Sequence, residues 1–130
     1  MVGLFSRIDK DPRKKNNVQK LKEIRSLVRD KKYDEALKIG IKYLQKVPHN
    51  HDVLFIVGGI YYMKNKYSIS ISYCDKILDI ATYDVPVLLL KAYSHQKLGE
   101  NKRAIQCCEK IREIDPKNKT VSELMRQLDS

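Results

Sequence analysis

The chain has 130 residues, of which 42% are hydrophobic and five are glycine. This length and composition are typical of one modest folded domain with a core, and they exclude a disordered tail. The longest apolar run, residues 53–63, is far shorter than the roughly 20 residues that a helix needs to cross a bilayer.

Basic residues are unevenly distributed along the chain. The 26 Lys and Arg residues exceed the 16 Asp and Glu residues, for a formal net charge of +10. The net charge is +7 for residues 1–32 (eleven basic and four acidic residues), zero for residues 33–84 (six and six) and +3 for residues 85–130 (nine and six). At the amino terminus, apolar residues precede the basic cluster, which is the reverse of a secretory signal. We therefore expect a cytoplasmic protein.

The amino-terminal segment, residues 1–16, contains a dense cluster of cations at Arg13, Lys14 and Lys15. Clustered cations gain free energy by releasing counterions condensed on polyanions, so this cluster is a candidate site for nucleic acid or anionic lipid. A solvated basic tail is the alternative and the more common case. The apolar residues ahead of the cluster are expected to dock on the protein, on a partner or shallowly on a membrane. They are Val2, Leu4, Phe5 and Ile8.

Residues 17–118 contain one 34-residue unit written three times, as 17–50, 51–84 and 85–118. Small residues recur within it, because the two helices of a hairpin approach closely only where side chains are short. Proline recurs near the end, where it stops a helix because it has no amide hydrogen. The recurring sets are Ala36, Ser70 and Ala104; Gly40, Cys74 and Cys108; and Pro48, Thr82 and Pro116. Such hairpins must stack to bury their apolar faces, which predicts a short solenoid.

Each unit predicts two helices, and one more follows the last unit. The first helices are expected over 17–30, 51–65 and 85–98, and the second helices over 34–47, 68–81 and 102–115. In the final segment, residues 119–130, apolar residues stand at helical spacing with charges opposite, which predicts a capping helix. These apolar residues are Val121, Leu124, Met125 and Leu128. The predicted fold is all-α, a solenoid of three antiparallel helix hairpins with a carboxyl-terminal cap.

The spacing and residue types resemble the tetratricopeptide repeat, whose 34-residue pattern runs small residue or glycine, tyrosine, alanine, aromatic, proline. The chain departs from this pattern at Lys20 and Glu23 in the first unit and at Thr82 in the second. It has no tryptophan, and Leu54 and Leu88 stand where that residue often opens the motif. The resemblance implies a right-handed superhelix that binds other molecules rather than transforming them.

In tetratricopeptide families the first helix of each repeat lines an inner, concave groove. Carried over by position, the resemblance implies a groove with an apolar and aromatic centre and a basic rim. Such a surface suits a peptide with apolar anchors. The candidate groove residues are Arg25, Arg29, Phe55, Ile56, Tyr62, Met63, Leu89, Tyr93 and Lys97.

Some members of this family grip the acidic carboxyl-terminal tails of heat-shock chaperones with lysine, asparagine and arginine at set places. In this chain the corresponding places hold Leu21, Arg25, Ile56, Pro86 and Leu90. The clamp is therefore essentially missing, and the resemblance implies a partner of another type.

The sequence shows no glycine-rich phosphate loop, no nucleophile motif and no CxxC pair. His49 and His51 stand two residues apart, but the neighbouring Asp52 alone does not complete a metal site, so solvent-exposed histidines are expected. An odd number of cysteines predicts buried, reduced thiols, with a vicinal redox pair at Cys107 and Cys108 as the alternative. We expect no catalysis, no metal and no cofactor.

These patterns together predict a cytoplasmic adaptor or scaffold that binds a protein or peptide in its groove. Two alternatives remain open. The first is a basic accessory protein that associates with nucleic acid or a membrane through residues 1–16. The second is a self-associating module whose groove is filled by its own amino terminus or by another copy.

Overall fold

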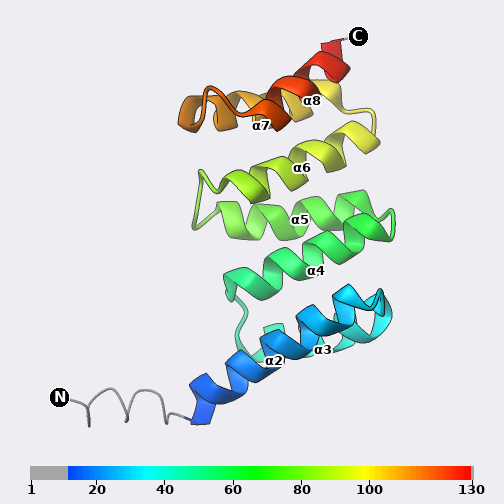
Figure 1. The fold of residues 1–130 in the computed structure, drawn as a ribbon, viewed down its shortest axis with the longest axis vertical. Coiled ribbons are helices and arrows are strands. Elements are labelled where there is room, and N and C mark those ends of the chain that lie inside the picture. The colour runs from blue at the N-terminus through cyan, green and yellow to red at the C-terminus, as the bar shows by residue number, and fades with distance from the viewer. Residues whose placement is uncertain (1–11, 130) are drawn as a thin grey trace, which may run out of the picture. The chain divides into compact units, whose positions relative to one another are not determined.

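A computed structural model describes residues 12–129 of the chain, with side chains from Asn16 onward (Figure 1). The described residues form helices joined by short turns, which confirms the all-α prediction. The helices are α2 (Pro12–Arg29), α3 (Tyr33–Lys46), α4 (His51–Met63), α5 (Tyr67–Leu78), α6 (Val85–Lys97), α7 (Asn101–Ile114) and α8 (Lys119–Asp129).

The helix bounds differ from the expected ones mainly at two places. Helix α2 begins at Pro12, five residues before the expected start at 17. Proline suits the first position of a helix, because its φ is already helical and its missing N–H has no partner there anyway. Helix α5 ends at Leu78, three residues before the expected end at 81.

The chain divides after Pro48 into two compact units. In unit 1, α2 and α3 pack against each other as a helix pair. In unit 2, which starts at His49, helices α4 to α8 follow one another in space in the order in which they occur in the chain (Figure 1). Each helix of unit 2 packs on the next, as the solenoid prediction requires.

The small residues of the repeat are buried where helices pair. Ala36, Ser70 and Ala104 are each 0% exposed. In the α4–α5 pair, a Cβ atom on Gly58 would lie 3.2 Å from the Cβ atom of Tyr73, which is tighter than ordinary van der Waals contact. The two helices therefore approach closely because Gly58 has no side chain.

The first helix of each pair ends in the same turn. The second residue after the end of each of these helices has a positive φ, 59° at Lys31, 63° at Asn65 and 76° at Gly99. The next amide then reaches back to a carbonyl five residues earlier, which is the Schellman motif. The accepting carbonyls are those of Leu27, Tyr61 and His95, at 2.8, 2.8 and 2.9 Å.

Side-chain caps open α4, α6 and α8. Each cap is an Asn or Asp whose Oδ1 accepts the amide hydrogen of the valine three residues later. The pairs are Asn50 with Val53 at 3.0 Å, Asp84 with Val87 at 3.1 Å and Asn118 with Val121 at 2.9 Å. Sequence analysis did not single out these caps, although an Asn or Asp every 34 residues is a signal that could have revealed them.

A hydrophobic cluster joins α6, α7 and α8 in unit 2. The last helix contributes Val121, Leu124 and Leu128, of which none is more than 7% exposed. Met125 packs against the same cluster from the side. The capping-helix prediction is therefore confirmed.

Candidate functional site

The first helices of unit 2, α4 and α6, carry seven of the nine candidate groove residues. On each helix a buried row faces the core, for example Val53 and Val57 on α4, and this leaves the candidate residues on another side. Met63 is 58% exposed, and Lys97 is exposed as well. The half-buried members of the set are Phe55, Ile56, Tyr62, Leu89 and Tyr93.

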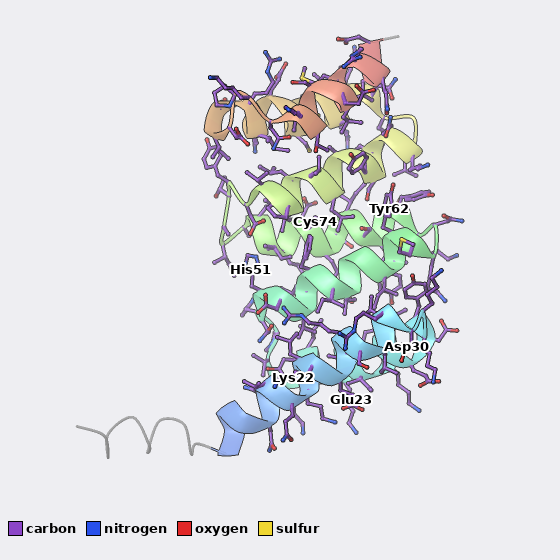
Figure 2. The ribbon with its side chains drawn as sticks, viewed as in Figure 1. Lys22, Glu23, Asp30, His51, Tyr62 and Cys74 are labelled. Carbon is purple, nitrogen blue, oxygen red and sulfur yellow. The ribbon has the colours of Figure 1, made fainter. Side chains whose placement is uncertain are left out.

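Tyr62 on α4 contacts the first residue of α5. Its ring meets that of Tyr67 edge-on, with centroids 5.3 Å apart and an interplanar angle of 66°. Burial raises the pKa of the Tyr62 phenol, and the nearby Tyr67 and Tyr93 raise it further. Tyr93 on α6 is thus near enough to Tyr62 on α4 to affect its phenol, and the groove itself stays a prediction. Figure 2 labels Tyr62 at the carboxyl-terminal end of α4, with His51 at the other end.

The α6 side of this surface is less open than the sequence suggested. Leu89 and Tyr93 pack partly against the cluster that joins α6, α7 and α8. Nε2 of Gln96 also donates to Oε1 of Gln127 on α8 at 3.3 Å. The capping helix therefore borders the surface and covers part of it.

Arg25 and Arg29 lie exposed on α2, in unit 1. Figure 2 labels Lys22 and Glu23 on the same helix and Asp30 directly after its end. The backbone of Arg13, Lys14 and Lys15 is helical, but their side chains lie outside the described residues. The residues predicted to dock also lie outside the described part of the chain: Val2, Leu4, Phe5 and Ile8.

The three cysteines are buried and unpaired by disulfide, as predicted. Burial raises the pKa of the Cys74 thiol to about 12 and that of Cys108 to about 11. Burial also raises the pKa of Cys107. A protonated thiol is a poor nucleophile, so this arrangement suits packing rather than thiol chemistry.

Two of the three histidines pair with single carboxylates. His51 begins α4, and its Nε2 lies 2.9 Å from Oδ2 of Asp84. His95 is only 4% exposed, and its Nδ1 lies 3.0 Å from Oε1 of Glu100. Across residues 16–129, no three His, Cys, Asp or Glu side chains gather as metal ligands would. None of the described helices has the length and hydrophobicity of a membrane span.

No protein-family model matches the sequence, and a search of curated proteins finds no significant match. The fold, in contrast, is similar to solved structures. The first TPR (tetratricopeptide repeat) domain of Spaghetti (RPAP3), bound to an HSP90 peptide, matches with a TM-score of 0.81 and 17% identity, over 86% of this chain and 89% of its own. The second TPR domain of human RPAP3, in complex with an HSP70 peptide, matches with a TM-score of 0.80 and 14% identity, over 87% and 94%.

A tetratricopeptide repeat protein from Parabacteroides merdae matches with a TM-score of 0.84 and 17% identity, over 93% of this chain and 46% of its own. The described chain therefore has the tetratricopeptide-repeat fold, with three helix pairs followed by a capping helix.

Proposed function

We propose that this chain is a protein-interaction adaptor that holds a peptide with apolar anchors against α4 and α6. The observation that carries the proposal is the group formed by Tyr62, Met63 and Tyr93, which stay half-buried or exposed on the first helices of unit 2. Partly exposed aromatic and thioether side chains that cluster in this way are the usual anchors of peptide recognition.

The chemistry of this surface suits an apolar anchor with a polar backbone around it. Tyrosine offers an apolar ring and a hydroxyl that can bond a peptide group, and methionine adapts its shape to different side chains. The Tyr62 phenol is protonated at neutral pH, as an ordinary tyrosine is, and burial raises its pKa further, so it is available as a hydrogen-bond donor. Lys97, at the end of α6, supplies a cation for an acidic flank of the peptide.

The comparisons support a peptide as ligand, because two similar domains are bound to chaperone peptides. The side chains at the chaperone-clamp places argue for a different peptide here. Of these places in unit 2, Ile56 and Leu90 are half-buried and apolar, and Pro86 is exposed. None of the three can pair with a carboxylate, so we propose that apolar anchors replace the acidic tail.

The proposal is tested by capture of partners from the source cell on the immobilised protein. Replacing Tyr62 and Met63 together by alanine should abolish capture, because it removes the most exposed anchors. Phe55→Ala with Tyr93→Ala should do the same. The matched control is Tyr83→Ala, which removes a tyrosine that is 54% exposed but lies in the loop before α6. If both double variants fold and keep every partner, the proposed surface is not the binding site.

A second experiment identifies what occupies the surface when no partner is present. Deleting residues 1–8 removes the apolar residues that were predicted to dock. A surface covered by this segment should gain affinity for apolar peptides, or the protein should begin to self-associate. An open surface should bind the same peptides equally well with and without residues 1–8, which would reject self-occlusion.

A further inference from the structure

A second concave feature lies in unit 2, away from the surface of the proposed adaptor. It is a groove of about 590 Å³ between α5 and α7, with α6 as its floor. On α6 the groove is lined by Leu88, Lys91 and His95. Successive helical residues are rotated by about 100°, so this row lies roughly opposite Leu89 and Tyr93. The groove and the proposed adaptor surface are therefore distinct.

Positive charge dominates this groove. Lys91, Lys102, Arg103 and Lys110 line it together with one carboxylate, Asp75, for a formal balance of +3. Only the first of these cations has an internal partner: Nζ of Lys91 lies 2.7 Å from Oδ1 of Asp75. Among residues 16–129, no carboxylate forms an ion pair with Lys102, Arg103 or Lys110.

The thiol of Cys107 on α7 lines the same groove as these charged side chains. Burial raises the pKa of this thiol, while the ammonium groups of Lys91 and Lys110 act in the opposite direction and Asp75 adds to the rise. Electrostatic effects of this kind require short separations. The two lysines and the carboxylate come from three helices and line the same groove as this thiol.

The remaining lining decides what kind of anion fits. Apolar side chains of Ile71, Leu78 and Leu88 line the groove together with the cations, so an occupant gains from apolar groups as well as from negative charge. No Phe, Tyr or Trp ring is among the described residues that line the groove, and a platform for stacking nucleic-acid bases is thus lacking. A peptide that alternates acidic and apolar side chains satisfies both parts of the surface.

We propose that the groove between α5 and α7 is a binding site for an acidic peptide segment. The carboxylates of the segment pair with Lys102, Arg103 and Lys110, and an apolar side chain rests between Ile71 and Leu78. Arg103 presents a planar fork of donors that matches a carboxylate in a bidentate pair. Asp75 competes with the peptide, because its carboxylate already pairs with Lys91 and repels an incoming carboxylate.

The test measures binding of a fluorescein-labelled twelve-residue peptide made of Glu and Leu only, by anisotropy at low and at physiological salt. Reversing three charges with Lys102→Glu, Arg103→Glu and Lys110→Glu should weaken binding by at least about tenfold. The matched control reverses three exposed lysines elsewhere in unit 2, Lys66, Lys117 and Lys119. This control changes the net charge equally and should weaken binding by less than about twofold.

A variant that is expected to bind the peptide more tightly gives a second test, because a misfolded protein would not gain affinity. Asp75→Asn keeps the shape of the side chain but removes the rival charge and releases Lys91. We expect the same peptide to bind roughly threefold more tightly. Unchanged or weaker binding of this variant would overturn the proposed role of Asp75 and, with it, the site.

Further measurements distinguish this groove from the basic cluster of α2, from the adaptor surface and from non-specific binding. Binding should persist when Arg13, Lys14 and Lys15 are replaced by glutamine, and when Tyr62 and Met63 are replaced by alanine. The second result makes failure of this site distinguishable from failure of the adaptor surface. Equal loss of binding in the control and the groove variants would show charge-driven, non-specific attraction. A single-stranded oligonucleotide of equal charge should compete less strongly than unlabelled peptide. If it competes equally well, the peptide proposal is overturned and the groove binds nucleic acid instead.

Discussion

Oδ2 of Asp84 lies 2.9 Å from Nε2 of His51, while Oδ1 of the same carboxylate accepts the amide hydrogen of Val87 at 3.1 Å. One side chain thus caps α6 and ties its start to the first residue of α4, 33 positions earlier. The side chain of His51 is 46% exposed, and exposed ion pairs contribute little to stability. The cap should therefore outweigh the pair.

Substitutions of Asp84 separate these two contributions. Asp84→Ala should lower the free energy of unfolding by about 1 kcal/mol, because it leaves the amide at the start of α6 without its acceptor. Asp84→Asn keeps an acceptor oxygen and should cost clearly less. Urea denaturation of the two variants, with His51→Ala for comparison, checks this order. A loss for Asp84→Asn as large as that for Asp84→Ala would assign the stability to the charge instead.

Two glycines should respond to alanine in opposite directions. Gly99 has a φ of 76°, where a Cβ atom is strained, so Gly99→Ala should destabilise the fold by about 1 kcal/mol. Gly59 lies within α4, and a Cβ atom there would meet nothing within 4 Å. Gly59→Ala should therefore stabilise the fold by about 0.5 to 1 kcal/mol. Thermal melts that show the same sign for both would contradict the assigned turn.

The close approach of α6 and α7 depends on small side chains. Ala104 is 0% exposed within the cluster that joins α6, α7 and α8. Ala104→Leu should overpack this cluster and cost about 1 to 3 kcal/mol. Thermal or urea melts measure the loss, with Lys117→Ala as a surface control of unchanged stability. An unaltered midpoint for the leucine variant would mean that the residue is not at a close contact.

The buried thiols should be unreactive in the folded protein and should make stability depend on pH. Burial raises the pKa of Cys74 from 9.0 to about 12 and that of Cys108 to about 11. The unfolded chain therefore ionises these thiols first, so their contribution is complete below pH 9 and is lost as the pH rises towards 11 to 12. In urea melts, the difference in unfolding free energy between the wild type and Cys74→Ala should therefore shrink as the pH is raised from 8 to 11. Fast reaction with a disulfide reagent before unfolding would contradict the assigned burial.

The basic cluster at the start of α2 gives a separate prediction about polyanions. If Arg13, Lys14 and Lys15 contact phosphates, affinity for random-sequence RNA or anionic vesicles should fall steeply with salt. Replacing the three by glutamine should flatten the salt dependence measured by filter binding or vesicle sedimentation. Salt-insensitive binding, or no binding at low salt, would leave the cluster as a solvated surface.

The sequence by itself determined the helix pairs and the packing places of this fold. A 34-residue period with small residues at fixed places leaves few ways for helices to approach, so the burial of Ala36, Ser70 and Ala104 followed from pattern alone. The order of the helices and the capping role of α8 followed likewise, since both depend on local periodicity and on covering an apolar face.

Only the tertiary structure decided which side chains from different helices meet. The partial cover of Leu89 and Tyr93 depends on where α8 lies against α6, and the bond between His51 and Asp84 depends on the relative position of two helix starts. The groove needed three helices at once, because Asp75, Lys91 and Lys110 come from α5, α6 and α7. Periodicity assigns each residue to a face of its own helix. The orientation of that face towards its neighbours is set by packing, which no single segment encodes.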